Sequence, residues 1–596
     1  MSPPDLSILL DSRKISRNKK EIQNLAKPIK RKTSILDNEQ GATRKSWGGK
    51  TSVALVYPNL YSVGMSNLGI HILYREMNER EDVLCERFFL PDEKELTELR
   101  QSGKPIRSIE SGRSLKEFDV VAFALSFEID GFNILDILRL GGIEIWSNQR
   151  PADQPFVLLG GPCATFNPEP WASFIDGAVI GEGEEIVKEL LDCWQPNLNR
   201  QEQIGNLKKI PGLYLPSLAI PTYDGENRYQ GLTTLSGEPF TPIERRWVSD
   251  LAKYPGYTEI ISPDSEFGHM FLIEVARGCG RHCRFCMAGY AFRRPRSRSV
   301  EEILSAIDEG KRRGAKQIGL VGAAVSDHPA IDLLVEAVDS AEMNLSVASL
   351  RADNVSEILL DKLSKSGQRT VTFAPEAGSE KLRRVINKGL DEEDLLRASR
   401  KAITAGMRHI RLYAMLGLPE EDETDIDELI RLARTIKQVM KEEKHLGKVI
   451  LSVNPFIPKP FTPFENLPLA DFKDVERKIR RLEKELPRSE GYEIKAESLK
   501  ESWVQAILAR GDRRLSEVIA NCGERGYREF ARQFKKSDLS ASQYLYQAKE
   551  EWPVYPWSHI DIGVEVGYFK REAEKAHLGE STLPCFEGCT RCGVCK

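Results

Sequence analysis

The sequence predicts an α/β fold in three parts: an N-terminal doubly wound parallel sheet, a partial (βα)6 barrel, and a mainly helical C-terminal region with a cysteine cluster. In the first two parts, short apolar runs alternate with segments of helical apolar spacing, and strands that alternate with helices form parallel sheets. A stretch rich in Pro, Gly, Thr and Tyr interrupts the alternation, which then resumes for six further units. After the sixth unit the sequence becomes charged and helical.

These changes divide the 596 residues into five segments. They are a basic N-terminal segment (1–48), the doubly wound domain (49–195), a β-type connector (196–265), the barrel (266–470) and the C-terminal region with four cysteines (471–596). The basic segment is more typical of a solvated surface helix than of an RNA-facing arm, because runs of charge are usually solvated.

The strands of the first sheet are predicted from apolar runs. The runs are 51–60, 119–127 and 155–162, followed by a strand, a glycine turn and a helix over 176–194. After the first run, apolar residues recur at helical spacing. Doubly wound sheets bind ligands outside the carboxyl ends of their strands, so we expect a ligand crevice in the loops that follow these runs.

The barrel is predicted from six further runs. They are "FLIEVA", "QIGLVG", "LSVASL", "TVTFAP", "HIRLYAMLG" and "VILSVNPF". Ser299 and Glu302 form a capping-box pattern that predicts a helix start after the first run. In such barrels the chemistry lies in the loops after the strands.

Composition is that of an ordinary soluble protein, with 41% hydrophobic residues, 29% charged residues and a formal net charge of −4. The net charge argues neither for nor against nucleic acid. No run reaches the roughly 18 apolar residues of a membrane span, and no signal-peptide core follows Met1. The sequence therefore predicts a cytoplasmic protein with no membrane partner.

Seven of the eleven cysteines fall in two tight groups, which favours metal over disulfides. Cys279, Cys283 and Cys286 form C-x3-C-x2-C on a loop after the first barrel strand. Structural zinc takes four ligands, and His282, between two of these cysteines, cannot easily turn to the same metal. A [4Fe–4S] cluster held by three cysteines leaves one iron open for a substrate or cofactor. A zinc site completed from elsewhere in the chain is the less favoured alternative.

This loop, with Phe285 before its last cysteine, resembles the radical SAM superfamily over roughly 266–470. The resemblance implies that S-adenosylmethionine (SAM) binds the open iron and is cleaved reductively to a 5′-deoxyadenosyl radical. It places SAM contacts at Gly322, Arg351, Glu376, Leu416 and Gly417, although the usual acid after the second strand is absent. An ordinary loop ion pair is the alternative role for Arg351 and Glu376. Four nearby arginines could face a polyanion or be solvated or paired within the chain; they are Arg293, Arg294, Arg296 and Arg298.

A doubly wound sheet before such a barrel resembles the cobalamin-binding subclass of the superfamily. The loops that would bracket the corrin and its nucleotide tail contain Tyr57, Gly64, Asn67, Gly160, Gly161 and Gly183. Glycines there would let the backbone approach a large flat ligand. The cobalt-ligating D-x-H-x-x-G motif is absent, and His71 is more typical of a core residue than of a ligand. A sheet that keeps the fold without binding a corrin is the alternative.

The tail "LPCFEGCTRCGVCK" holds Cys585, Cys589, Cys592 and Cys595. Four thiolates complete a coordination sphere, so a second iron–sulfur cluster or a four-cysteine zinc site is expected here. This Cys-rich ending resembles an uncharacterised bacterial family of B12-type radical SAM proteins.

Together these features predict a radical SAM enzyme that acts as a cobalamin-dependent methyltransferase on an unactivated carbon in RNA or protein. The cofactors would be the [4Fe–4S] cluster, SAM, cobalamin and the second cluster or zinc, and the electron donor would be of flavodoxin or ferredoxin type. Two alternatives are a radical SAM reaction without methyl transfer, with the sheet as a substrate platform, and a non-catalytic Fe–S protein that binds RNA or senses redox state.

Overall fold

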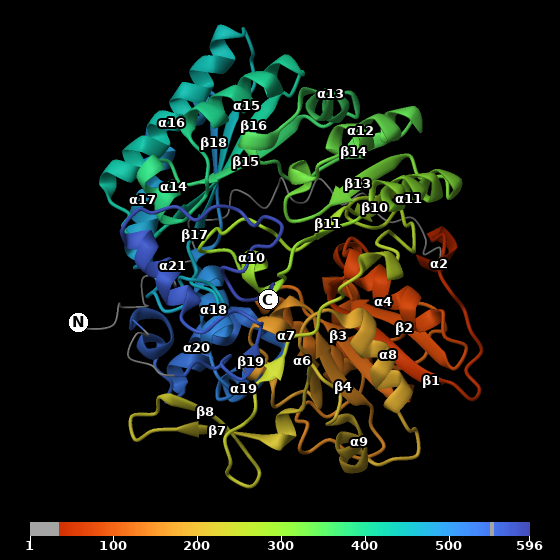
Figure 1. Cartoon of the computed structure of the whole chain (residues 1–596). Coiled ribbons are helices and arrows are strands. Elements are labelled where there is room, and N and C mark those ends of the chain that lie inside the picture. Colours follow the sequence, from red (N-terminus) through yellow and green to blue (C-terminus); the bar gives the residue numbers. More distant parts are fainter. Residues whose placement is uncertain (1–34, 549–553, 596) are drawn as a thin grey trace.

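The computed structural model describes residues 35–548 and 554–595. Most of the predicted basic segment, residues 1–34, lies outside the described residues. Within the described ranges, no helix is both long enough and apolar enough to cross a lipid bilayer. The chain forms an N-terminal sheet domain, a barrel and a helical C-terminal region that packs against both (Figure 1).

The N-terminal domain is built on a six-stranded sheet of order β2-β1-β3-β4-β5-β6, in which only β6 is antiparallel. The strands are β1 (Thr51–Leu60), β2 (Val83–Leu90), β3 (Val120–Ala124), β4 (Phe156–Gly160), β5 (Gly177–Val179) and β6 (Leu213–Tyr214). The order of the first five strands is that of flavodoxin-like sheets, whose ligand site lies where the strand order reverses, between β1 and β3.

Helices cover both faces of this sheet, as the predicted doubly wound fold requires. They are α4 (Leu68–Asn78), α6 (Gly131–Leu140), α7 (Pro162–Phe166) and α8 (Gly183–Cys193). Alternate residues of β1 enter different cores: Val53 and Leu55 pack with α4 and α8, whereas Ala54 and Val56 share a core with α6. Both faces are therefore buried, which explains why the strands are almost continuously apolar.

The connector after this domain is less purely β than predicted. It contains the helix α9 (Arg200–Leu207) as well as the hairpin of β7 (Ala219–Tyr223) and β8 (Tyr229–Thr234). Its short strand β9 (Ile243–Glu244) pairs with β19 (Ile560–Asp561), so the connector and the C-terminal region are joined by backbone hydrogen bonds.

The barrel contains all six predicted strands and one more. In order they are β10 (Met270–Glu274), β13 (Gln317–Val321), β14 (Asn344–Ser346), β15 (Thr370–Glu376), β16 (His409–Leu416), β17 (Val449–Pro455) and β18 (Tyr492–Ala496). Neighbouring strands are parallel, and a bridge between Leu350 and Phe373 joins the first three to the last four. The seventh strand, β18, shows that the barrel sheet continues beyond the expected boundary at residue 470.

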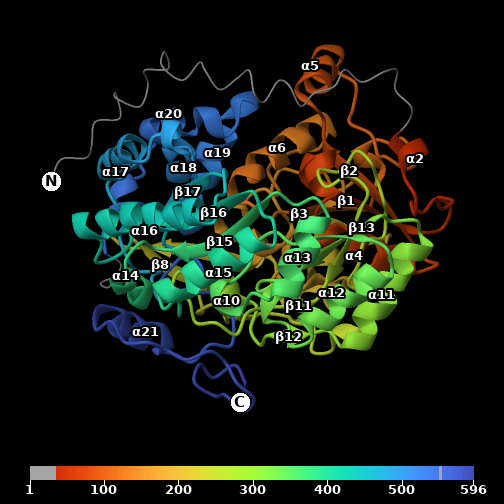
Figure 2. The same ribbon diagram turned by 90° about the horizontal axis from the view of Figure 1, so that it is seen from above.

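Helices form the outer layer of the barrel (Figures 1 and 2). They are α11 (Val300–Arg312), α12 (Ile331–Ser340), α13 (Glu357–Lys365), α14 (Glu380–Val385), α15 (Glu392–Thr404), α16 (Glu423–Glu442) and α17 (Phe472–Glu485). The predicted capping box is present at α11, where Ser299 Oγ accepts from the Glu302 amide and the Glu302 side chain accepts from the Ser299 amide.

The C-terminal helices lie in two places. The first group is α18 (Leu499–Arg510), α19 (Leu515–Ala520) and α20 (Tyr527–Lys536), and its apolar side chains join the core of the N-terminal sheet. The last helix, α21 (Tyr568–His577), packs against α14 instead. The chain then turns toward the short helix α10 (Ala288–Ala291) beside the first cysteine loop (Figure 1).

Candidate active site

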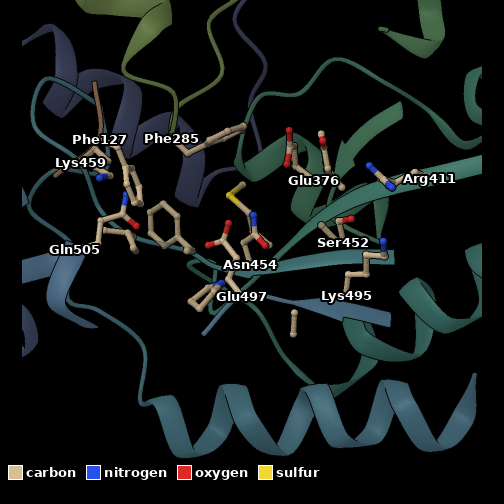
Figure 3. A pocket seen from close by; sticks show the side chains of 17 residues that line it. Phe127, Phe285, Glu376, Arg411, Ser452, Asn454, Lys459, Lys495, Glu497 and Gln505 are labelled. Atoms are coloured by element: carbon tan, nitrogen blue, oxygen red, sulfur yellow. The ribbon is translucent and has the colours of Figure 1, made fainter. Parts of the chain in front are cut away.

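A cavity of about 620 Å³ lies where the barrel faces the N-terminal domain. Its wall includes inward-facing residues of β15 to β18, together with Phe285 of the cysteine loop, Phe127 after β3 and Gln505 of α18 (Figure 3). On β16 the pattern alternates: Ile410 and Leu412 are buried in the barrel core, whereas Arg411 and Tyr413 line the cavity. The cavity therefore joins the carboxyl edges of both parallel sheets.

The first cysteine loop connects β11 (Ala276–Arg277) to α10. Cys283 is buried, Cys279 and Cys286 are partly buried, and all three thiols are free. Burial raises the pKa of Cys286 to about 12 and holds that of Cys279 above its ordinary value. Such thiols are protonated at neutral pH and become good ligands when a metal displaces the proton.

The donor set fits a polynuclear cluster better than a single ion. In residues 35–548 and 554–595, no three His, Cys, Asp or Glu side chains converge on one point as the ligands of one ion would. Tetrahedral zinc, with Zn–S bonds of about 2.3 Å, needs its sulfurs only about 3.8 Å apart. In a [4Fe–4S] cluster each thiolate binds a different iron, so convergence on one point is not needed. The loop thus fits the cluster that its spacing predicts.

Among the predicted SAM contacts, Glu376 lines the cavity. It ends β15 in a left-handed conformation, with φ of 64°, and accepts a hydrogen bond from Lys388 Nζ at 3.1 Å. Arg351 is not among the cavity residues. Its guanidinium donates to Asp353 Oδ1 at 3.0 Å and to the Lys388 carbonyl at 3.1 Å, which is the loop pairing considered as the alternative.

The other three predicted contacts do not line the cavity with side chains. Leu416 is buried in the barrel core, and its carbonyl accepts from the Phe456 amide at 2.8 Å. Gly417 has φ of 82°, and its amide donates to Glu421 Oε1 at 2.9 Å. At Gly322 an added Cβ would lie 3.3 Å from Val275, so this glycine allows two strand ends to approach.

Met415, the neighbour of Leu416, lines the cavity and packs against the same buried cluster as Phe285. Arg411 also lines the cavity, and its buried Nε has no hydrogen-bond partner among the described residues. Sequence reasoning missed both residues. The period-2 alternation of "HIRLYAML" could have found them, because the apolar core residues at 410, 412, 414 and 416 assign 411, 413 and 415 to the other face.

Three of the four clustered arginines are paired within the chain. Arg293 contacts His282, Arg296 binds Glu182, and Arg298 binds Glu274. Arg294 lies over the Trp247 ring at 5.4 Å. The paired alternative therefore holds for three of them, and they do not form a surface for a polyanion.

Two ionic contacts fix the N-terminal domain against the barrel. Glu182, before α8, accepts from Arg296 Nη2 at 2.6 Å. Burial alone would raise the pKa of Glu182, but its hydrogen bonds with Arg296 and the charge of Arg277 hold that pKa below its ordinary value. On the other side, Glu128 contacts Lys459 and accepts from Gln505 Nε2 at 3.0 Å.

The residues predicted to contact cobalamin lie at the carboxyl edge of the N-terminal sheet. Asn67 caps α4 through the Gly69 amide, and its Nδ2 donates to Ser126 Oγ at 3.3 Å. Tyr57 is buried near the carboxyl end of β1, and burial raises its pKa. These two side chains lie at the β1/β3 switch point, the edge at which sheets of this strand order bind ligands.

The glycines of this edge have roles within the protein. An added Cβ would lie 2.5 Å from the Phe89 ring at Gly64, 2.7 Å from the Leu125 carbonyl at Gly161, and 3.1 Å from Leu73 at Gly183. Gly161 also has φ of 94°. Gly160 differs, because one backbone oxygen at 3.8 Å is the nearest atom that a Cβ would meet.

His71 is a core residue, as its apolar helical setting predicts. It is 1% exposed, its Nε2 lies 3.0 Å from the Met65 carbonyl, and its Nδ1 accepts from the Ile260 amide at 3.2 Å. Both ring nitrogens are therefore engaged within the protein.

The four tail cysteines are free thiols and lie beside the first cysteine loop. Cys589 and Cys592 are buried, and Cys585 and Cys595 are partly buried. The Cys585 amide donates to the Gly280 carbonyl at 2.7 Å. The two cysteine groups, separated by about half of the chain, thus meet in space.

The fold and the site together define a barrel iron–sulfur enzyme whose cysteine loop opens into the cavity through Phe285. Residues 273–433 match the family model described as radical SAM superfamily, and residues 69–216 match the model described as radical SAM proteins, N-terminal. An uncharacterised protein of Methanocaldococcus jannaschii is 30% identical over 78% of this chain and 90% of its own length. The chain belongs to the radical SAM superfamily.

More distant relatives include proteins named as methyltransferases. An uncharacterised methyltransferase of Pyrococcus horikoshii is 26% identical over 47% of this chain and 58% of its own length. The cytidylyl-2-hydroxyethylphosphonate methyltransferase of Streptomyces wedmorensis is 23% identical over 51% of this chain and 59% of its own. The chain covers less than two thirds of either protein.

Similar solved structures include the radical SAM methyltransferase TsrM of Kitasatospora setae, at 15% identity and a TM-score of 0.44, covering 70% of this chain and 74% of that one. The cobalamin-dependent SAM radical enzyme OxsB matches at 14% identity and a TM-score of 0.45, covering 81% of this chain and 72% of that one.

Proposed function

We propose that this radical SAM enzyme is a cobalamin-dependent methyltransferase that acts on an unactivated carbon of RNA or protein. The observation that carries the proposal is the position of the cavity: Phe127, directly after β3 of the N-terminal sheet, and Phe285 of the cysteine loop line the same space. A cofactor at the β1/β3 switch point and SAM at the loop would therefore face each other across one acceptor site.

When bound, the cluster with SAM supplies a hydrogen-abstracting radical and methylcobalamin supplies a methyl group. Cys279, Cys283 and Cys286 would hold the cluster, with Glu376 placed to bind the SAM ammonium or ribose hydroxyls by charge-assisted hydrogen bonds. Tyr57 and Asn67 would lie beside the corrin. The chain's remaining task is to orient the reactants and to exclude water.

Arg411 and Lys495 place positive charge on one part of the cavity wall, and Glu376 and Glu497 line the same cavity. Tyr413, Ser452 and Lys495 are neighbours across β16, β17 and β18, and Arg411 lies two residues further from the carboxyl edge than Tyr413. An unpaired guanidinium Nε in this position would bind an anionic group, such as a phosphate or carboxylate of the acceptor. The acceptor would then bind with its anionic end beside Arg411.

The central experiment is anaerobic reconstitution of the full chain with iron, sulfide, SAM and dithionite. Formation of 5′-deoxyadenosine supports the radical reaction, and none is expected from Cys283→Ala. Product formed by Cys283→Ala, whether alone or in the same amount as by the wild type, would contradict the assigned loop.

The methyl-transfer part has its own test. Purification in the presence of hydroxocobalamin should give about one corrin per chain by absorbance. A colourless chain that still forms 5′-deoxyadenosine would favour the second candidate, a radical SAM reaction without methyl transfer. The close packing at Gly64, Gly161 and Gly183 is the observation that supports this second candidate.

The acceptor class is open to direct measurement. Mass spectrometry of RNA and protein digests from a deletion strain should reveal one missing methyl group. The internal pairing of Arg293, Arg296 and Arg298 removes them as support for RNA, so both digests are needed.

A further inference from the structure

The tail cysteines are anchored to the radical SAM loop rather than carried on a separate unit. Besides the hydrogen bond from the Cys585 amide to the Gly280 carbonyl, an added Cβ at Gly280 would lie only 3.3 Å from Cys585 Cβ. Gly280 directly follows Cys279 in the sequence. The second cysteine group therefore contacts the residue next to the first cysteine of the loop.

His282 makes a second link between the two groups. Its Nε2 lies 3.3 Å from Cys585 Sγ, and its Nδ1 lies 3.0 Å from Arg293 Nη2 and 2.6 Å from Tyr568 Oη. Because a guanidinium can only donate, Nδ1 accepts, and the ring proton of the neutral imidazole is on Nε2. His282 therefore donates a hydrogen bond to the sulfur of Cys585.

Buried contacts hold this arrangement rigid. Arg284 and Glu572, both almost fully buried, form an ion pair at 3.3 Å. Asn387 Nδ2 donates to the His282 carbonyl at 3.0 Å and to the Thr582 carbonyl at 2.9 Å. The side chain of Asn387 in the barrel therefore binds both the cysteine loop and the tail.

The two ends of the cysteine loop face different surroundings. Phe285 lines the substrate cavity, whereas Gly280 and His282 contact the tail. On the far side of Cys585, the flanking side chains of Leu583 and Phe586 are 71% and 66% exposed. A protein that approaches from solvent can therefore reach the tail group without entering the cavity.

The four tail cysteines are also not arranged as the ligands of a single metal ion would be. All four of them are described, and no three of them converge as zinc ligands would. A polynuclear cluster, in which each thiolate binds a different iron, suits this arrangement.

From these contacts we propose that Cys585, Cys589, Cys592 and Cys595 hold a second iron–sulfur cluster that passes electrons to the radical SAM cluster through the Gly280–His282 edge of the loop. The step transfers one electron and makes or breaks no bond. A flavodoxin- or ferredoxin-type donor is oxidised by one electron, the tail cluster is reduced and then reoxidised, and the loop cluster is reduced. The inference rests on the proposed radical SAM function but not on cobalamin or methyl transfer.

Metal content and spin coupling provide the first test. The anaerobically reconstituted wild type should contain about eight iron atoms per chain, falling to about four in Cys589→Ser/Cys592→Ser. In the reduced wild type, two nearby paramagnetic clusters should broaden each other's electron paramagnetic resonance signals, and the double variant should lose this broadening. Cys193→Ser, which changes a cysteine outside both groups, is the matched control. One zinc with about four irons, or two clusters without magnetic coupling, would overturn the proposal.

The role of His282 can be measured without turnover. Loss of its N–H donor in His282→Ala should lower the reduction potential of the tail cluster, because hydrogen bonds to cluster sulfur stabilise the reduced form. His282→Gln, which keeps a donor, should recover part of the shift. An unchanged potential in His282→Ala would contradict the assigned hydrogen bond.

The relay itself is tested by comparing two reductants. The ratio of flavodoxin-driven to dithionite-driven 5′-deoxyadenosine formation should fall at least tenfold in the tail double variant, because a small reductant can reach the loop cluster directly. A proportional loss with both reductants, or no loss with either, would reject the relay. If the wild type makes no 5′-deoxyadenosine with dithionite, the proposed function fails, whereas the metal and potential measurements still decide the tail site.

Discussion

The two parallel sheets meet at one cavity, but they present different surfaces to it. The barrel contributes a row of inward side chains, such as Arg411, Tyr413 and Met415 of β16, which leave open space between them. The N-terminal sheet contributes Phe127, while Asn67 is hydrogen bonded to Ser126 and Gly161 is packed on Leu125. The barrel is therefore built around its ligand space, whereas the edge of the other sheet is closed by its own packing.

This difference indicates where each sheet can tolerate amino-acid substitutions. Substitutions on the cavity face of the barrel should affect ligands more than folding, since those side chains contact few protein atoms. Substitutions at the packed glycines of the N-terminal sheet should affect folding first, because an added Cβ at Gly64 or Gly161 would meet neighbouring atoms. Four predictions can break or sharpen this contrast.

The largest effect is expected from Cys283→Ala in the barrel loop. Loss of one of three thiolates should abolish the loop cluster and 5′-deoxyadenosine formation, because a [4Fe–4S] cluster with one open iron needs all three loop cysteines. The melting temperature of the iron-free protein should stay close to that of the iron-free wild type. A large drop in that temperature would show that the loop cysteine is structural.

At the cavity wall, Glu376→Gln should weaken SAM binding by about ten- to hundredfold, the usual value of a hydrogen bond to a charged group. Titration of SAM into the reconstituted enzyme, followed by the change in the cluster's spectrum, measures this effect. Glu380→Gln, at an exposed position of the next helix, is the control. Equal affinity in both variants would remove Glu376 from the SAM site.

In the N-terminal sheet, His71 makes stability depend on pH. Burial lowers its pKa to about 4, below the 6.5 of an exposed histidine, so the folded state binds fewer protons than the unfolded state. The contribution of neutral His71 to the free energy of unfolding is complete above pH 6.5 and falls as the pH drops toward 4. At pH 5 this contribution is smaller by about 2 kcal/mol. Hydrogen exchange of β1 and α4 amides should show this loss, and His71→Gln should show a shallower pH dependence.

The smallest effects are expected from substitutions of two adjacent glycines, Gly160 and Gly161. Gly161→Ala should destabilise the domain by about 1–3 kcal/mol, because an alanine there adopts a strained backbone and meets a carbonyl. Gly160→Ala should change stability by less than about 0.5 kcal/mol. If cobalamin passes over this edge, Gly160→Ala should reduce the bound corrin while leaving the melting temperature unchanged. Equal melting temperatures for the two variants would contradict the closed-edge description.

The sequence was sufficient to predict the α/β class, most strands of both sheets, the α11 cap and the two cysteine groups, because each depends on local spacing. It missed β2 of the N-terminal sheet. It was not sufficient for the seventh barrel strand, which follows a long charged helix, or for the role of Met415, which depends on which face of β16 is inward. The pairing of Arg296 with Glu182 spans 114 positions and depends on two domains packing together. Gly161 was predicted from its flexibility, but its partner, the Leu125 carbonyl, is a tertiary contact.

The ion pair between Arg284 and Glu572 has a consequence for how the protein matures in the cell. Its two residues are 288 positions apart, and both are almost fully buried. During synthesis the cysteine loop leaves the ribosome long before α21 does, with a guanidinium that has no counter-charge to bury against. Iron insertion should therefore wait until translation is nearly complete, and products shortened before α21 should carry no redox-active metal.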